Sequence, residues 1–299
     1  MTFERILMEK NKKKFGDRKD GVWLKDLDGM HLIMPHLMPK RTESEVYLQE
    51  QMDVTQLLKY IKEKNAENLG YKMTPFHLVV AAVAKTIYFR PYLNRFVSGK
   101  RIYQRKEISL SFVVKRAFED NAEEMLFIMK AKPEQTIFDI SKKISGDSAR
   151  LKKEASTDIN DIMNFVGRMP RLLTRLFFAV VRFLDFHGWM PNAITSGDPN
   201  FTTVMLSNLG SIKCDAPYHH LNNYGTNSIM ITVGEIHKAA VVNEKEEIEI
   251  RDVVNLGCTV DERIADGFYF ARSIRFIKYL LANPHILEQP IDTEVDYEF

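Results

Sequence analysis

The predicted helix over residues 75–90 constrains the fold most, because it is apolar on most of its faces. The segment TPFHLVVAAVAKTIYFRP starts with Thr74, a natural N-cap, and with Pro75, which fits the first helical position. Pro91 then ends the helix, since proline cannot continue the backbone hydrogen-bond ladder. A helix without a wide polar face must be covered by other elements, so we expect it to lie buried inside the domain.

Helices and strands are interleaved around this helix without a strict β-α-β alternation. That order favours an α/β (α+β) fold in which helices cover a mixed sheet. Residues 1–44 are expected to form an N-terminal arm and entry segment, and residues 45–299 one domain. The expected strands cover residues 45–55, 201–207, 228–234, 238–242, 247–251 and 253–260, a hairpin-like pair lies within 101–116, and the further helices cover 57–69, 136–154 and the segment between Asp266 and Pro284.

The charge balance and the cysteines argue against several kinds of partner. The net charge of +2 gives no electrostatic reason to expect a nucleic acid. Cys214 and Cys258 are too few for a disulfide scaffold and lack a metal-binding spacing, so we expect a reducing compartment and no metal. The first 20 residues are charged, unlike a secretory signal, and no run of 18 uncharged apolar residues occurs. We therefore expect a cytoplasmic protein.

One segment, residues 166–190, is strongly amphipathic and belongs to an expected insertion around residues 160–195. On a helical wheel its four arginines fall within an arc of about 60°, and leucine, phenylalanine and valine side chains occupy the opposite side. The segment fits a helix that lies on the protein with its arginines in water. It also fits an interfacial helix that meets anionic lipid, or a lid over an acyl-chain pocket. The four residues are Arg168, Arg171, Arg175 and Arg182.

Three stretches of the chain, in order, resemble one protein family. They cover residues 52–114, 204–242 and 256–284, and they include the sequences Ser-Asn-Leu-Gly at 207–210 and Asp-Glu-Arg-Ile-Ala-Asp-Gly at 261–267. In this order and spacing they resemble the catalytic domain of the trimeric acyltransferases, which comprise the dihydrolipoyl acyltransferase cores of 2-oxo acid dehydrogenases and chloramphenicol acetyltransferase.

The resemblance implies a two-layer fold with a mixed sheet covered by helices, and a homotrimer with the active site between subunits. Coenzyme A or a lipoyl thiol would enter from one side and a small-molecule acyl acceptor from the other. Ser207 would donate a hydrogen bond to the tetrahedral oxyanion. Asp266 would hold its loop by pairing with an arginine, which we cannot assign before residue 45, and it is also a natural helix cap.

Glu262 stands where this family carries its catalytic histidine. A CoA-type thiol titrates near ~8.5 and a glutamate near ~4.3, so proton transfer to an ordinary carboxylate is uphill by about 5.7 kcal/mol. A glutamate whose pKa is raised by an apolar channel would recover most of this deficit. Alternatively, His219 or His220, in the loop after Ser207, reaches the site as the base; otherwise the two histidines belong to a solvent-exposed loop.

These residues favour an enzyme, a stand-alone acyltransferase that moves an acyl group from acyl-CoA to a hydroxyl, amine or thiol. The chain shows no lipoyl-domain sequence, so we expect no lipoyl group and a free acyl-CoA donor. The alternative is a catalytically inactive trimeric binding or scaffold protein of the same fold, which keeps the Asp266–Gly267 loop for stability. CoA-binding residues cannot be assigned from the sequence.

Overall fold

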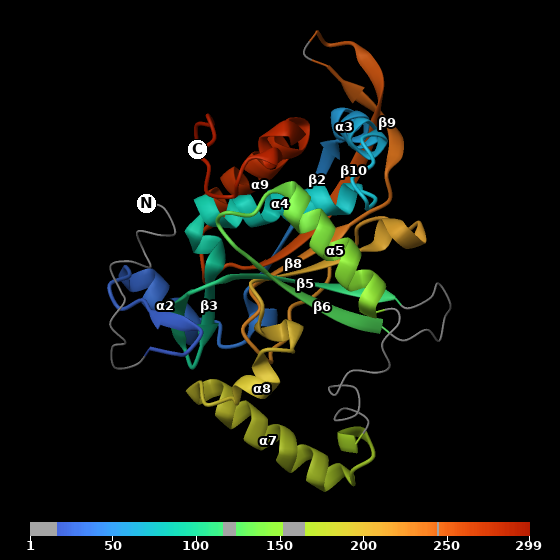
Figure 1. Ribbon diagram of the computed structural model, residues 1–299. Coiled ribbons are helices and arrows are strands. Elements are labelled where there is room, and N and C mark those ends of the chain that lie inside the picture. Colours follow the sequence, from blue (N-terminus) through green and yellow to red (C-terminus); the bar gives the residue numbers. More distant parts are fainter. Residues whose placement is uncertain (1–16, 116–123, 152–164, 244) are drawn as a thin grey trace.

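The computed structural model describes residues 17–115, 124–151, 165–243 and 245–299. Two sheets and a layer of helices make up this part of the chain (Figure 1). The elements are β1 (Gly21–Trp23), α2 (Gly29–Leu37), β2 (Glu45–Asp53), α3 (Thr55–Ala66), α4 (Pro75–Phe89), β3 (Arg95–Ser98), β4 (Arg101–Arg105), β5 (Ile108–Lys115), β6 (Glu124–Ala131), α5 (Ile137–Leu151), α7 (Arg171–His187), α8 (Asn192–Thr195), β7 (Val204–Asn208), β8 (Ile229–Val233), β9 (His237–Val242), β10 (Ile248–Asp261) and α9 (Gly267–Ala282).

The larger sheet confirms the predicted mixed topology. Its strand order is β2-β10-β8-β7-β5-β6, and β9 pairs with the first half of β10. Strand β7 runs parallel to both of its neighbours, β5 and β8, whereas the other pairs are antiparallel. Strands β1, β4 and β3 form a separate sheet of three strands.

Helix α4 lies at the centre of the helical layer, as its apolar sequence predicts. Helices α3, α4, α5 and α9 lie on one face of the larger sheet (Figure 1), and every residue of α4 from His77 to Tyr88 is buried. The buried stretch includes one charged side chain. The Lys85 ammonium donates hydrogen bonds of 2.8–3.2 Å to three carbonyls of residues 290–293, so its charge is satisfied and the C-terminal segment is tied to α4.

Two predictions about strands are wrong in detail. The segment 101–116 does not fold as a hairpin, because β4 pairs with β1 and β3 whereas β5 belongs to the larger sheet. The connecting Lys106–Glu107 pair also lacks the glycine or asparagine that tight two-residue hairpin turns favour. The predicted strands 247–251 and 253–260 form one strand, β10, in which Asp252 is tied to Lys238 of β9 at 2.8 Å.

The N-terminal region contributes structure that the sequence pattern does not reveal. Of the expected arm, residues 1–16 lie outside the described residues. Residues 21–23 form β1 and pair with β4, and residues 29–37 form helix α2, whose N-cap is Asp28. The boundary at residue 44 remains a prediction.

Acid is expected to destabilise the fold through His77, at the start of α4. Burial lowers the pKa of His77 to about 4, whereas the pKa in the unfolded chain is near ~6.5. Between these values the unfolded chain binds a proton that the folded protein does not, so stability is lost as the pH falls through this window, by about 3 kcal/mol. Urea unfolding at pH 7.5 and pH 4.5 measures this loss. We expect it to shrink in His77→Leu and to persist in His285→Gln, a change at an exposed histidine; an equal loss in all three proteins would contradict the prediction.

Candidate active site

Ser207 lies near the end of β7, on the face of the sheet opposite the helical layer. Side chains alternate along a strand, and the buried Val204 and Leu206 point toward the helices, so Ser207 points the other way. The register pairs it with Thr232 of β8. In the part of the chain that the structure describes, the Ser207 hydroxyl has no hydrogen-bond partner, which leaves it available to a ligand.

The connection between β7 and β8 runs across this same face. Residues that pair side by side across neighbouring strands form a row of the sheet. In the row of Ser207, Thr232 Oγ1 donates a hydrogen bond of 2.6 Å to the Pro217 carbonyl. Farther on, the Leu221 amide donates to Glu45 Oε1 at 2.5 Å, and Glu45 pairs in register with Asp261. The connection therefore leads from the row of Ser207 to the row of Asp261.

His219 and His220 lie between these two anchors. Both side chains are exposed, and their rings stack with centroids 4.9 Å apart. His219 Nδ1 lies 3.1 Å from the His220 carbonyl. The pair thus belongs to a solvent-exposed loop, but that loop lies on the sheet face that carries Ser207.

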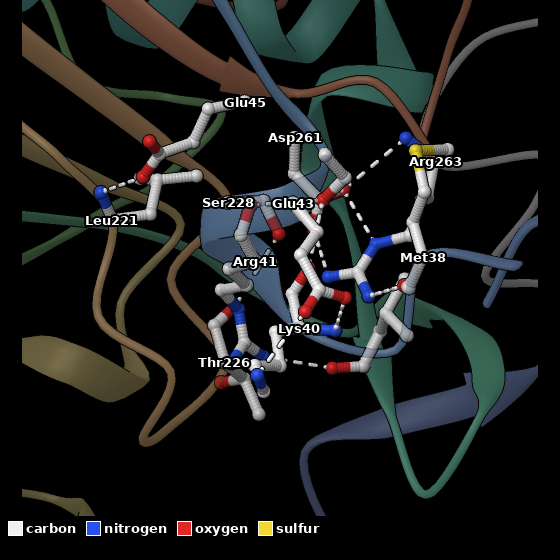
Figure 2. Close-up of polar contacts among 12 residues, drawn as sticks. Met38, Lys40, Arg41, Glu43, Glu45, Leu221, Thr226, Ser228, Asp261 and Arg263 are labelled. Carbon is white, nitrogen blue, oxygen red and sulfur yellow. Dashed lines mark hydrogen bonds and ion pairs between the residues drawn. The ribbon is translucent and has the colours of Figure 1, made fainter. Parts of the chain in front are cut away.

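Glu262 follows β10 directly, in a turn that is fixed on both sides. Its backbone amide donates a hydrogen bond of 2.9 Å to the Ser44 carbonyl. The flanking residues, Asp261 and Arg263, form a buried ion pair, with Arg263 Nε and Nη2 2.8 and 2.7 Å from the two carboxylate oxygens (Figure 2). Arg263 also donates to the Met38 carbonyl at 2.7 Å. The Glu262 side chain is half-buried, and its backbone position is set by these neighbours.

A second buried guanidinium, that of Arg41, lies beside this turn (Figure 2). It donates to the Val97 carbonyl at 2.8 Å. Burial lowers the pKa of Arg41 to about 10, and the nearby Asp261 carboxylate opposes that shift. Arg41 therefore stays charged at neutral pH, and the neighbouring hydroxyl of Ser44 donates to Asp261 at 3.0 Å. The sequence pattern gave no indication of this arginine.

Asp266 is the N-cap of α9, as predicted, and accepts a hydrogen bond of 2.7 Å from the Tyr269 amide. Its carboxylate makes no ion pair with an arginine among the described residues. The ion pair of this loop joins Asp261 to Arg263 instead, and the arginine that the resemblance implies for Asp266 stays unassigned. Arg263 engages both carboxylate oxygens of Asp261.

Within one chain, Ser207 and Glu262 do not meet. The registers place Ser207 in one row with Thr232 and Gly257. Asp261 is four residues farther along β10, about 13 Å, and Ser207 is two strand spacings to the side, about 10 Å. A side chain cannot bridge a gap of this size. A reaction centre that uses both groups must therefore take them from two copies of the chain.

Metal and thiol chemistry find no support in the described residues. They contain no group of three or more histidine, cysteine, aspartate or glutamate side chains that could hold a metal ion. Burial raises the pKa of the Cys258 thiol to about 12, so this cysteine stays protonated and is a poor nucleophile. Cys214 is exposed on the β7–β8 connection.

The fold and the serine-bearing strand end define a domain of the acyltransferase class. The family model described as 2-oxoacid dehydrogenases acyltransferase (catalytic domain) matches residues 31–157 and 191–288. These two ranges make up most of the chain, and they include Ser207, Glu262 and Asp266. The chain belongs to this family, which confirms the resemblance seen in the sequence.

Individual relatives agree with this assignment. The lipoamide acyltransferase component of the branched-chain alpha-keto acid dehydrogenase complex of Bacillus subtilis (strain 168) is 25% identical over 248 residues, which cover 81% of this chain and 48% of the relative. The chain thus spans about half the length of that protein.

Solved structures show the same fold. A probable dihydrolipoamide acetyltransferase from Listeria monocytogenes 4b F2365 superposes with a TM-score of 0.57 at 19% identity, covering 87% of this chain and 94% of the other. A chloramphenicol acetyltransferase superposes with a TM-score of 0.51 at 11% identity, covering 87% and 99%. The predicted α/β fold, a mixed sheet covered by helices, is therefore correct.

Proposed function

We propose that this chain is a CoA-dependent acyltransferase that moves an acyl group from free acyl-CoA to the hydroxyl, amine or thiol of a small acceptor. The observation that carries the proposal is the hydroxyl of Ser207, which has no hydrogen-bond partner among the described residues and lies on the face opposite the helices, in a sheet that belongs to an acyltransferase catalytic domain. A hydroxyl without a protein partner is able to donate to an oxyanion as it forms. We propose that this chain carries no lipoyl group.

The proposed assembly is a homotrimer in the cytoplasm, with each active site between two subunits. The distance between Ser207 and Glu262 within one chain supports a shared site, because only a second copy can supply the missing group. Most soluble homo-oligomers are closed and symmetric, and that is the arrangement we propose for the copies of this chain.

In the proposed reaction, the acceptor heteroatom attacks the thioester carbon while the Glu262 carboxylate takes its proton. The carbonyl oxygen becomes an oxyanion and accepts a hydrogen bond from Ser207 of the other copy. The carbon–sulfur bond then breaks, and the departing CoA thiolate recovers the proton from Glu262. His219 and His220 are the alternative bases, since their loop approaches both the Ser207 row and the Asp261 row. Asp266 stabilises the loop by capping the N-terminus of helix α9.

We expect Ser207→Ala to lower acyl transfer by about 10²–10³-fold, because it removes one donor to the oxyanion. Free-thiol release is measured with a panel of acyl-CoAs, from acetyl to long-chain, and a pool of hydroxyl, amine and thiol acceptors. The matched control is Ser211→Ala, a nearby exposed serine whose hydroxyl bonds only the Asn208 carbonyl in the described structure.

The outcomes distinguish an acyltransferase from an inactive binding or scaffold protein of the same fold. Acceptor-dependent thiol release that falls in Ser207→Ala and persists in Ser211→Ala supports acyl transfer. Equal rates in both variants remove Ser207 from the mechanism. A protein that neither releases thiol nor binds CoA would instead be the inactive binding or scaffold member of the fold.

A further inference from the structure

We propose that helix α7 docks the protein on the surface of an anionic lipid bilayer. The helix is the regular part of the amphipathic segment predicted from the sequence. It begins after Pro170 and ends at Gly188, which adopts the left-handed conformation (φ 70°) that favours glycine. In Figure 1 it lies apart from the sheet and its covering helices.

The acyltransferase fold does not require this helix. The family match stops at residue 157 and resumes at residue 191, so α7 lies entirely in the unmatched segment between them. The helix is therefore an addition to the part of the domain that the family model covers, and the chemistry of its side chains indicates what it contacts.

The apolar side of α7 faces away from the protein body. None of its residues is buried, and Leu172, Leu176 and Phe183 are 76%, 62% and 54% exposed. On the helical wheel these three lie within about 40° of one another. Thr174, Val181 and Asp185, which are only half-exposed, cluster on the opposite side. A contiguous strip of exposed apolar side chains is unfavourable in water and marks a contact surface.

The charges of the helix select a lipid surface over other apolar partners. Arg171, Arg175 and Arg182 are all exposed and line one flank of the apolar strip, and Arg168 continues this flank. The only acid of the helix, Asp185, points inward and accepts a hydrogen bond from the Gly225 amide at 3.2 Å. Every exposed formal charge of α7 is thus positive, as in helices that lie in the interface of anionic membranes.

The C-terminal end of the helix is anchored to the protein body. The Asp185 carbonyl accepts hydrogen bonds from Ser98 Oγ at 3.2 Å and from Arg18 Nη1 at 3.4 Å. Phe186 lines a hollow together with α2, and α2 exposes its own apolar side chains, including Met30, Ile33 and Leu37. The C-terminal end of α7 thus lies close to a second helix that exposes apolar side chains.

The geometry fits a helix that lies flat in the interface. Seventeen residues extend about 26 Å, and no helix in the described ranges is long and apolar enough to pass through a bilayer. Trp189, at the anchored end, is 62% exposed, and tryptophan is enriched at the interface between membrane and water.

The test uses the full chain with phosphatidylcholine vesicles, with or without phosphatidylglycerol. We expect sedimentation with the anionic vesicles and about 30-fold less partitioning for Arg171→Ala/Arg175→Ala, since each arginine near an anionic surface contributes about a fivefold factor. Lys59→Ala/Lys62→Ala removes the same charge from the exposed side of α3 and is expected to bind normally. In a Trp23→Phe background, Trp189 emission should shift to the blue only with anionic vesicles.

Leu172→Ser/Leu176→Ser tests the apolar strip without changing the charge. We expect it to lose binding, while Ile248→Ser/Ile250→Ser, at two exposed isoleucines of the β9–β10 hairpin, retains it. Absence of sedimentation with anionic vesicles overturns the proposal. So does a change of oligomer mass in the leucine variant without loss of vesicle binding, because a second copy would then cover the strip. Vesicle binding is measured without an acyl donor, so its result does not depend on whether the protein transfers acyl groups.

Discussion

Acyl transfer is expected to fall by about 10²–10⁴-fold in Glu262→Gln, because glutamine cannot accept the proton of the attacking group. The turn itself should persist, since Glu262 contributes only its backbone amide to the bond with Ser44. Transfer is measured as CoA thiol release over a range of pH. A rate in Glu262→Gln within a few-fold of the native rate would show that this carboxylate is not the base.

Two further variants identify the base. Glu262→His introduces the histidine that the family resemblance implies at this position. We expect it to keep transfer while the acid limb of the pH profile moves up, as imidazole titrates near ~6.5 and a carboxylate near ~4.3. His219→Gln/His220→Gln is expected to change the rate little. If His219→Gln/His220→Gln loses activity and Glu262→Gln does not, the base lies in the β7–β8 connection.

Asp261→Asn is expected to cost about 3–5 kcal/mol of folding stability, because it leaves a buried guanidinium without its counter-charge. The Arg263 and Asp261 side chains are 2% and 0% exposed, so water cannot replace the lost carboxylate. Urea denaturation of the purified variant measures the change in the free energy of unfolding.

An exposed ion pair provides the control for this prediction. Asp252→Asn breaks the bond to Lys238, whose side chain is largely in water, and is expected to cost less than about 1 kcal/mol. If the two substitutions cost the same, burial does not strengthen the Asp261–Arg263 pair, and the turn that carries Glu262 is held by other contacts.

Local patterns in the sequence were sufficient for much of the fold. The apolar surface of residues 75–90, which covers most faces of the helix, requires its burial, and Thr74, Pro75 and Pro91 mark its ends through backbone chemistry alone. Asp266 caps α9 for the same local reason. The order of the Ser-Asn-Leu-Gly and Asp-Glu-Arg-Ile-Ala-Asp-Gly segments was enough to identify the family, because order and spacing are properties of the chain.

Strand partners were not determined locally. The polar and apolar alternation of residues 101–116 is the same whether β4 and β5 pair with each other or with distant strands. What separates them is Arg105, whose buried guanidinium donates to the carbonyls of Phe201 and Thr202, nearly a hundred residues away. Strand β6 and helix α2 were likewise missed. Strand β6 is defined by its pairing with β5, and helix α2 contains Pro35, a residue that argues against a helix.

The sequence by itself determined the positions of helices α4 and α9, the family and the glutamate at position 262. Each of these depends on neighbouring residues or on their order. Only the tertiary structure decided that Arg263 pairs with Asp261, that Ser207 and Glu262 lie in different rows of the sheet, and that the apolar strip of α7 faces outward. These depend on which distant segments share a surface. Burial and strand register decide which segments do so, and both exist only once the chain has folded.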